Sequence, residues 1–420
     1  MNKKDLVNNS CIKNFLEKNN DIGNINWFIR IWDFDLNKGE NEKVIKDAKV
    51  WFSIYWINSL EELKNSKKNI IIVIPALTWN AKIFSQTSTQ WDGWANTYWK
   101  KWNILDPNKN IIIGLDYFGG PYDSSCPDKH NLDFFPVFAI KQVEAWKKAI
   151  KILWVEKVFA LFWGSNWWWH IHNWLFDTEF FPEYLISIAW PIAPTNEAKE
   201  FFSLQTDFIK NKENVSERLE KNLEKFLWIS KLYDFLVSKT FEEIKNCVEN
   251  WENKKTIKIT RQIWFLKFLN PTFFDKFYFD KNWKKLNEKQ AEKNMMNYFE
   301  NEGKKFEKRF SLSSLALLSE SIALAERISP EEYTKKIKQS SVNLLILSIE
   351  DDNLFKTKPM QNYFEEIKKI RKEKWCSWQT NIIMLKSNEN TKIAWHDAFL
   401  WPEEMQKISD LIMVKLKNIF

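Results

Sequence analysis

Short, continuous runs of β-branched residues constrain the fold of this chain more than any other feature. Residues 69–75 read Asn-Ile-Ile-Ile-Val-Ile-Pro, and a second isoleucine run begins at Asn110. A run that is apolar at every position predicts a strand buried on both faces, as in a parallel sheet. Because segments with helical spacing separate these runs, the sequence predicts an α/β fold with a mostly parallel, doubly wound sheet.

The same alternation continues along the chain. Further strands are predicted at 49–55, 157–162, 184–189, 342–348 and 380–385, and helices at 138–153, 361–374 and 402–417. Between the strands that end at 189 and begin at 342, Lys, Glu, Asn and Phe dominate, and a segment this long predicts a helical lobe rather than a loop. We therefore expect a core formed by residues 1–196 and 336–420, with a helical lid inserted at 197–335.

Charge and cysteine spacing exclude several classes of protein. The 62 basic and 55 acidic residues give a net charge of +7 but are interleaved, which argues against nucleic-acid binding. The cysteines lie far apart, which argues against a zinc site or a disulfide framework; they are Cys11, Cys126, Cys247 and Cys376. The N-terminus has no apolar signal region and no run is long enough to cross a membrane, so we expect a cytoplasmic protein without a bound metal.

A serine motif follows the strand at 157–162. The residues are Trp163-Gly164-Ser165-Asn166-Trp167-Trp168, and a helix is predicted after them. A strand, a tight turn that holds a serine, and a helix form a nucleophile elbow, which has the pattern G-x-S-x-G because the turn leaves no room for β-carbons beside the serine. Here tryptophan stands at both outer glycine positions.

An acid and a histidine follow later strands. Asp352 comes soon after the strand at 342–348, and His396 comes after the strand at 380–385. Together with Ser165 they give the order Ser, Asp, His that α/β-hydrolases have. The paired histidines His170 and His172 are two residues apart and face different sides of a helix, which argues against a metal site.

With these motifs, the chain resembles the homoserine O-acetyltransferase family, acyltransferases with the α/β-hydrolase fold. The family pattern A-L-T-G is matched by residues 76–79, G-G-S-x-G-G by 163–168, and G-H-D-A-F-L by 395–400. Looser matches lie at 118–122, 134–136 and 261–263, and the resemblance extends from about Trp51 to the C-terminus.

Nearly every mismatch in the three main motifs is tryptophan in place of glycine. The chain has 25 Trp and only 8 Gly, and the two together slightly exceed the usual glycine content of about 7%, which leaves room for a few true tryptophans. Some bacterial lineages read UGA as glycine, and translating such a gene with UGA as tryptophan produces this composition. The surplus of Asn, Lys, Ile and Phe fits an AT-rich genome. We therefore interpret most of the tryptophans as glycines of the natural polypeptide.

The resemblance implies a ping-pong reaction of methionine biosynthesis, with acetyl-CoA as co-substrate and no bound cofactor. Ser165 is expected to attack the thioester, His396 to accept its proton, and Asp352 to orient the imidazole. The backbone N–H groups of Leu77 and Asn166 are expected to form the oxyanion hole. The hydroxyl of L-homoserine then takes the acyl group, with acetyl favoured over succinyl as donor.

The resemblance also implies an acceptor site and a homodimer formed through the lobe. Arg261 is expected to bind the carboxylate of the acceptor and Asp397 its ammonium group, with Thr78 nearby. Phe268 stands where family members usually have a tyrosine, which leaves the identity of the acceptor open.

Each assignment has a plainer alternative. Ser165 could cap a helix, Asp351 or Glu350 could be the triad acid in place of Asp352, His396 could be a surface histidine, and Arg261 could form a salt bridge within the lobe. For the whole chain, the alternatives are an esterase with the same triad and a catalytically inactive homologue that serves as a binding protein.

Overall fold

A computed structural model describes the chain in segments. The described residues are 25–36, 44–57, 59–76, 80–84, 105–106, 108–121, 124–130, 137–164, 173–174, 182–188, 196–210, 214–224, 231–249, 253–268, 274, 276–280, 284–325, 328–337, 342–349, 357–373, 380–385 and 410. The C-terminal helix predicted at 402–417 lies almost wholly outside them.

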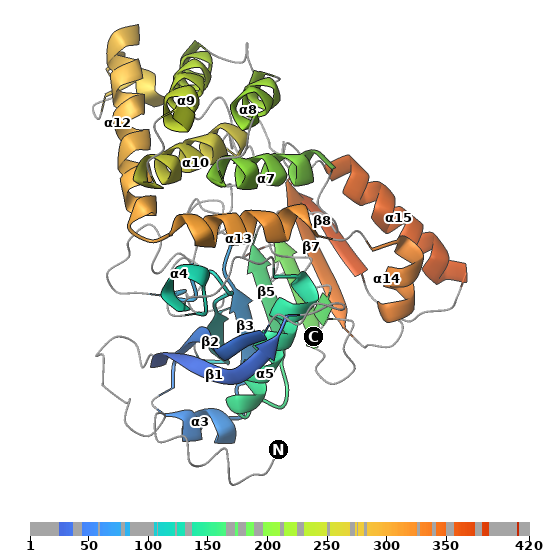
Figure 1. Cartoon of the computed structure of the whole chain (residues 1–420). Helices are drawn as coiled ribbons and strands as arrows, with labels where there is room; N and C mark the ends of the chain where they lie inside the picture. Colours follow the sequence, from blue (N-terminus) through green and yellow to red (C-terminus); the bar gives the residue numbers. More distant parts are fainter. Residues whose placement is uncertain are drawn as a thin grey trace.

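The centre of the molecule is an eight-stranded sheet with the order β1-β2-β4-β3-β5-β6-β7-β8 (Figure 1). The strands are β1 (Ile25–Asp35), β2 (Val44–Tyr55), β3 (Asn69–Ile74), β4 (Asn110–Leu115), β5 (Ala160–Gly164), β6 (Tyr184–Ile188), β7 (Asn343–Ile349) and β8 (Thr380–Leu385). Strands β3 to β8 are parallel to one another, whereas β2 is antiparallel to both β4 and β1. The sheet is therefore mostly parallel with an antiparallel hairpin at one edge.

The helices fall into two groups. Four helices connect consecutive strands along the chain: α3 (Leu60–Asn65), α4 (Pro127–His130), α5 (Ala139–Ile152) and α15 (Thr357–Glu373). The chain between β6 and β7 forms α7 (Asn196–Ile209), α8 (Val215–Glu224), α9 (Lys231–Glu249), α10 (Asn253–Phe268), the 3-10 turn η2 (Lys276–Tyr278), α12 (Glu288–Glu307), α13 (Leu312–Ala323) and α14 (Pro330–Ile337). Figure 1 shows α7 to α13 gathered on one side of the sheet.

Helix α13 of the second group contacts the chain segments that follow β4. The hydroxyl of Ser321 accepts a hydrogen bond from the backbone N–H of Val137 at 3.1 Å, and Ser313 donates to Asp128 at 2.7 Å. Just beyond the carboxyl end of β4, a methyl group at Gly119 would lie 2.6 Å from Leu317 of α13. Helix α13 therefore packs where β4 ends.

Two apolar clusters stabilise these parts. The larger one contains residues of the sheet, α5, α7 and α13, including Ile72, Ile113, Trp146, Phe201 and Leu315. A separate cluster holds the outer helices α9, α10 and α12 together; it consists of Leu232, Tyr233, Leu236, Val237, Phe265, Leu266, Phe274, Phe277, Ala291, Met295 and Phe299. The outer part of the helical insertion thus has a core of its own.

All seven strands that the sequence predicts are present, whereas β1 and α3 were not predicted. Strand β1 has buried Ile29, Ile31 and Phe34 alternating with exposed Arg30 and Asp35, which is the pattern of a strand with one face in water. No helix within the described ranges combines the length and apolar character that a membrane span requires.

Candidate functional site

Most of the predicted site residues lie outside the described part of the chain. These are the triad residues Ser165, Asp352 and His396, the oxyanion-hole residues Leu77 and Asn166, and the acceptor-site residues Thr78 and Asp397. Of the predicted set, the structure describes Arg261 alone, which lies in α10. The strands that precede these residues are described, and they constrain where the chain leaves the sheet.

The register of the strands brings the starting points of Ser165 and Asp352 to one edge. Gly164 at the end of β5 pairs with Ile188 of β6, and Ile188 pairs with Leu347 of β7. Two strand spacings separate Gly164 from Leu347, which is roughly 10 Å. Because the strands are parallel, the chain that continues to Ser165 and the chain that continues to Asp352 both leave the sheet at the carboxyl ends of the strands.

Strand β3 ends beside β5 at this edge. Its last residue, Ile74, pairs with Trp163, so the chain that leads to Leu77 and Thr78 starts next to the end of β5. After those residues, the described segment 80–84 lies against β4, because a methyl group built at Gly114 would lie 2.2 Å from the carbonyl oxygen of Ala81. The absence of a side chain at Gly114 therefore permits the close approach of this segment.

A buried polar group marks the carboxyl end of β4. Asp116 is fully buried, its Oδ1 accepts a hydrogen bond from the N–H of Tyr117 at 3.0 Å, and its carbonyl accepts one from Nε1 of Trp146 at 2.7 Å. Burial, together with the nearby Asp116 carboxylate, raises the pKa of Tyr117 well above its usual value. Sequence reasoning missed these residues, although an acid directly after a buried strand was a visible signal.

The loop after Asp116 has a fixed shape. The hydroxyls of Ser124 and Ser125 accept hydrogen bonds from the N–H groups of Trp51 and Lys49 in β2, at 2.8 and 2.9 Å. Within the loop, the N–H of Gly120 donates to the carbonyl of Tyr117 at 2.9 Å, and φ of the intervening Gly119 is +79°. This is the geometry of a type II turn, which requires glycine at its third position.

Arg261 is buried in α10, with 6% of its surface exposed. Its guanidinium carbon lies 4.2 Å from the ring centroid of Phe265, 5.2 Å from that of Phe306 and 5.9 Å from that of Trp264. Contacts of this kind between a guanidinium and aromatic rings are cation–π interactions, and an arginine so held can use its N–H groups to bind a carboxylate.

A charge cluster in the insertion, in which Glu302 is buried and Lys276 is exposed, was not predicted. Burial lowers the pKa of Lys276 to about 8, and the nearby Glu302 opposes this shift. The ammonium nitrogen of Lys276 lies 4.6 Å from the ring centroid of Tyr298, and the nearly buried Glu302 accepts a hydrogen bond from Lys305 at 2.6 Å. Tyr298, Glu302 and Lys305 share one face of α12, but only tertiary packing brings Lys276 of η2 to them, so the sequence carries no local signal for its place in this cluster.

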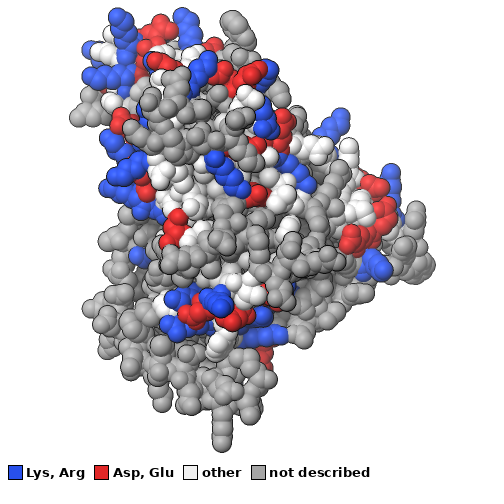
Figure 2. Space-filling view, in the orientation of Figure 1, with Lys and Arg blue, Asp and Glu red and all other residues white. Residues whose placement is uncertain are grey.

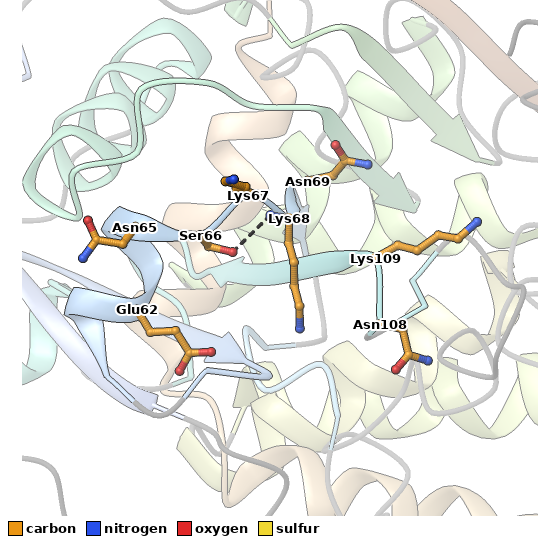
Figure 3. Close-up of a pocket in the computed structure, with 8 residues that line it drawn as sticks. All are labelled: Glu62, Asn65, Ser66, Lys67, Lys68, Asn69, Asn108 and Lys109. Carbon is orange, nitrogen blue, oxygen red and sulfur yellow. Dashed lines mark hydrogen bonds between the residues drawn. The ribbon is translucent and has the colours of Figure 1, made fainter.

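An open depression lies at the opposite, amino-terminal edge of the sheet (Figure 3). Its volume is about 670 Å³, and its lining is Glu62, Asn65, Ser66, Lys67, Lys68, Asn69, Asn108 and Lys109. In Figure 3, the side chain of Lys68 runs into the space between Glu62 and Asn108, whereas that of Lys109 points away. This lining contains no histidine, cysteine or triad residue, so the depression is separate from the predicted catalytic edge.

Charges and possible metal ligands are dispersed over the described residues. Figure 2 shows basic and acidic side chains intermixed over the helical insertion on the visible face. Within the described ranges, no group of three or more His, Cys, Asp and Glu side chains could hold a metal ion.

Comparison with solved structures identifies the architecture, whereas no family model matches the chain. Homoserine O-acetyltransferase from Staphylococcus aureus is similar with a TM-score of 0.62 at 15% identity, covering 92% of this chain and 95% of that one. Esterase E22 is similar with a TM-score of 0.63 at 13% identity, covering 91% and 99%. MGS-M2, an α/β-hydrolase enzyme from a Medee basin deep-sea metagenome library, gives 0.51 at 11% identity, covering 88% and 96%. The predicted fold is thereby confirmed: this chain has the α/β-hydrolase fold.

Proposed function

We propose that this protein is an acyltransferase that moves an acetyl group from acetyl-CoA to the hydroxyl of L-homoserine. The observation that supports the proposal is that β5, in the parallel block of the sheet, ends at Gly164, the residue before Ser165 in the sequence. Strands β3 and β7, which precede Leu77 and Asp352 in the sequence, end on the same side of the sheet as β5. A serine at this point of an α/β-hydrolase sheet is where the fold carries its nucleophile.

The proposed reaction has two halves. Ser165 attacks the thioester carbonyl while His396 takes its proton, and Asp352 holds the imidazole in the required tautomer. The N–H groups of Leu77 and Asn166 stabilise the oxyanion, and the loss of one such donor typically costs about 3 kcal/mol. The protonated His396 donates its proton to the leaving thiolate of CoA, and an acetyl-serine remains.

In the second half, His396 removes the proton of the homoserine hydroxyl, whose oxygen attacks the acetyl-serine. The bond between the acetyl group and the Ser165 oxygen breaks, and His396 returns the proton to that oxygen. Arg261 binds the carboxylate of the acceptor, a role that its buried, ring-stacked guanidinium supports. Asp397 pairs with the ammonium group, and Thr78 lies nearby. We further propose that the enzyme is a cytoplasmic homodimer of methionine biosynthesis.

An esterase with the same triad is the second candidate. The similarity to esterase E22 favours it as much as the similarity to the acetyltransferase favours transfer, because the two TM-scores are 0.63 and 0.62. The two functions differ in whether water or an amino-acid hydroxyl takes the acyl group from Ser165. A catalytically inactive homologue is the third candidate, and true tryptophan beside Ser165 favours it.

The deciding experiment measures CoA release from acetyl-CoA with and without L-homoserine. The assayed protein is a variant in which glycine replaces tryptophan at positions 79, 163, 167, 168 and 395, and the same variant with Ser165→Ala is the control. For a transferase, we expect homoserine to accelerate CoA release and O-acetylhomoserine to accumulate in equal amount. Release at one rate with or without homoserine indicates the esterase, and no release by either protein indicates the inactive homologue.

A further inference from the structure

Three tryptophans outside the sequence motifs adopt a left-handed backbone conformation. Within the described residues, the non-glycine residues with positive φ are Trp32 (59°), Asp47 (50°), Trp56 (67°), Trp154 (58°) and Asn214 (58°). Asp and Asn enter this region because their short polar side chains tolerate it, whereas a bulky residue there is a steric outlier. Finding one aromatic residue type at three of these positions therefore requires an explanation.

Trp154 lies just after the end of helix α5, at a position where many helices have glycine. The C-cap of the helix is Leu153, so Trp154 is the first residue beyond the cap. Its N–H donates to the carbonyl of Lys151 at 3.1 Å, and the N–H of Val155 donates to that of Ile150 at 3.2 Å. These two bonds define a Schellman motif, in which the residue at the position of Trp154 is left-handed and usually glycine.

Trp32 lies at a β-bulge between β1 and β2. The register shifts between Arg30 and Trp32 and again between Trp32 and Phe34. In one common class of bulge, the left-handed residue is glycine, because a β-carbon crowds the neighbouring carbonyl there. The side chain of Trp32 is 42% exposed, so the core gains little from burying this indole.

Trp56 directly follows the last residue of β2, with φ at 67°. Its ring packs 4.9 Å from that of Phe84, but its indole Nε1 is buried and has no hydrogen-bond partner within the described part of the chain. A buried indole N–H usually has a partner. At this position, both the backbone and the polar atom of tryptophan are in unfavourable environments.

Trp146 shows the contrasting case. It lies inside α5, its side chain is fully buried, and its Nε1 donates to the carbonyl of Asp116 at 2.7 Å. Nothing in the backbone at this position requires glycine. Backbone conformation therefore separates tryptophans that suit their positions from those that do not.

We propose that positions 32, 56 and 154 are glycine in the protein that its own cell makes, because the gene has UGA codons there that the cell reads as glycine. Three different structural motifs lead to this conclusion: a helix C-terminus, a bulge and a strand end. Each is independent of the motifs around Ser165 and of the acyl-transfer reaction. The written sequence thus differs from the natural one at positions throughout the fold, not only at the candidate site.

Peptide mass mapping of the protein isolated from its own cells tests the proposal directly. We expect the peptides that contain positions 32, 56 and 154 to have masses that correspond to glycine. Tryptophan at any of the three positions would overturn the proposal, whatever the activity of the protein.

A recombinant series tests the conformational argument separately, using melting temperature as its readout. We expect the triple variant Trp32→Gly, Trp56→Gly and Trp154→Gly to melt about 2–4 °C higher than the protein that has tryptophan at these positions, because glycine adopts the left-handed conformation without steric strain. Trp146→Gly is the matched control and should lower the melting temperature by several degrees, because it leaves a cavity in the core and places glycine inside a helix. A triple variant that melts at or below the temperature of the written chain would refute the argument, and this readout does not depend on whether Ser165 is a nucleophile.

Discussion

The close approach at Gly114 gives the sharpest test of how the sheet positions the candidate site. Gly114 lies in β4, paired with Ser53 of β2 and Val73 of β3. In Gly114→Ala, the new methyl group would lie 2.2 Å from the carbonyl oxygen of Ala81, whereas real β-carbons essentially never come closer than 3.0 Å to another heavy atom. The segment that carries Ala81 must therefore move by at least 0.8 Å, the difference between these distances.

This displacement has a cost in stability and a larger cost in activity. Forcing an extra methyl group into a packed interior typically costs about 1–3 kcal/mol. Segment 80–84 directly follows Leu77, Thr78 and Trp79 in the sequence, and a displacement of about 1 Å near reacting groups can reduce the rate by about 100-fold. We expect kcat for acetyl transfer to fall by about 10- to 100-fold in a protein that still folds.

The assay pairs urea denaturation with initial rates of CoA release, and Gly303→Ala is the control. Gly303 lies inside α12, where an added β-carbon would be 3.1 Å from Cγ of the flexible Lys258 side chain. We expect this control to keep its activity and to change stability by less than about 1 kcal/mol, because the better helix propensity of alanine is offset by close contacts with Cβ and Cγ of Lys258. If Gly114→Ala unfolds and reacts as the parent does, segment 80–84 does not contact β4 as described.

Three further predictions concern single side chains, each measured by urea denaturation. Tyr233→Phe removes a buried phenol that donates to the carbonyl of Leu266 at 2.6 Å, so we expect a loss of about 1–2 kcal/mol; no change would mean that this bond contributes nothing. Burial lowers the pKa of Lys276 from 10.5 to about 8, so between these pH values the unfolded chain holds a proton that the folded protein has released, and stability should rise with pH. Lys276→Met should remove this rise, and an unaltered pH profile would contradict the assignment. Ser124→Ala leaves the N–H of Trp51 without its 2.8 Å acceptor and should cost about 1 kcal/mol, whereas a neutral effect would show that water replaces the hydroxyl.

The parallel strands were predictable because burial on both faces leaves a simple pattern in the sequence. Every residue of β4 is buried, and the run of isoleucines that begins it was sufficient to predict a central strand. Strand β1 was missed because its buried residues alternate with outward-facing Arg30, Trp32 and Asp33, which breaks the apolar run. Alternation was the signal that could have identified this edge strand.

The candidate site was predictable only where its signal is local. A strand followed by a turn with Ser165 can be recognised within a few residues. In contrast, the cluster of Lys276 and Glu302 forms by packing of η2 against α12, and neither residue stands in a motif. Likewise, the sequence motifs indicated tryptophan in place of glycine near Ser165, but only the backbone conformation identified Trp154 as a further such position.

Intact-mass spectrometry of the protein after brief exposure to acetyl-CoA detects the proposed acetyl-serine itself. The protein used is the variant in which glycine replaces tryptophan at positions 79, 163, 167, 168 and 395. We expect a mass increase of one acetyl group, located in the peptide that contains Ser165. The increase should be absent from the Ser165→Ala variant and should disappear when L-homoserine is added. An acetyl group that persists in Ser165→Ala, or CoA release with no acetylated protein at any time, would contradict a covalent mechanism through this serine.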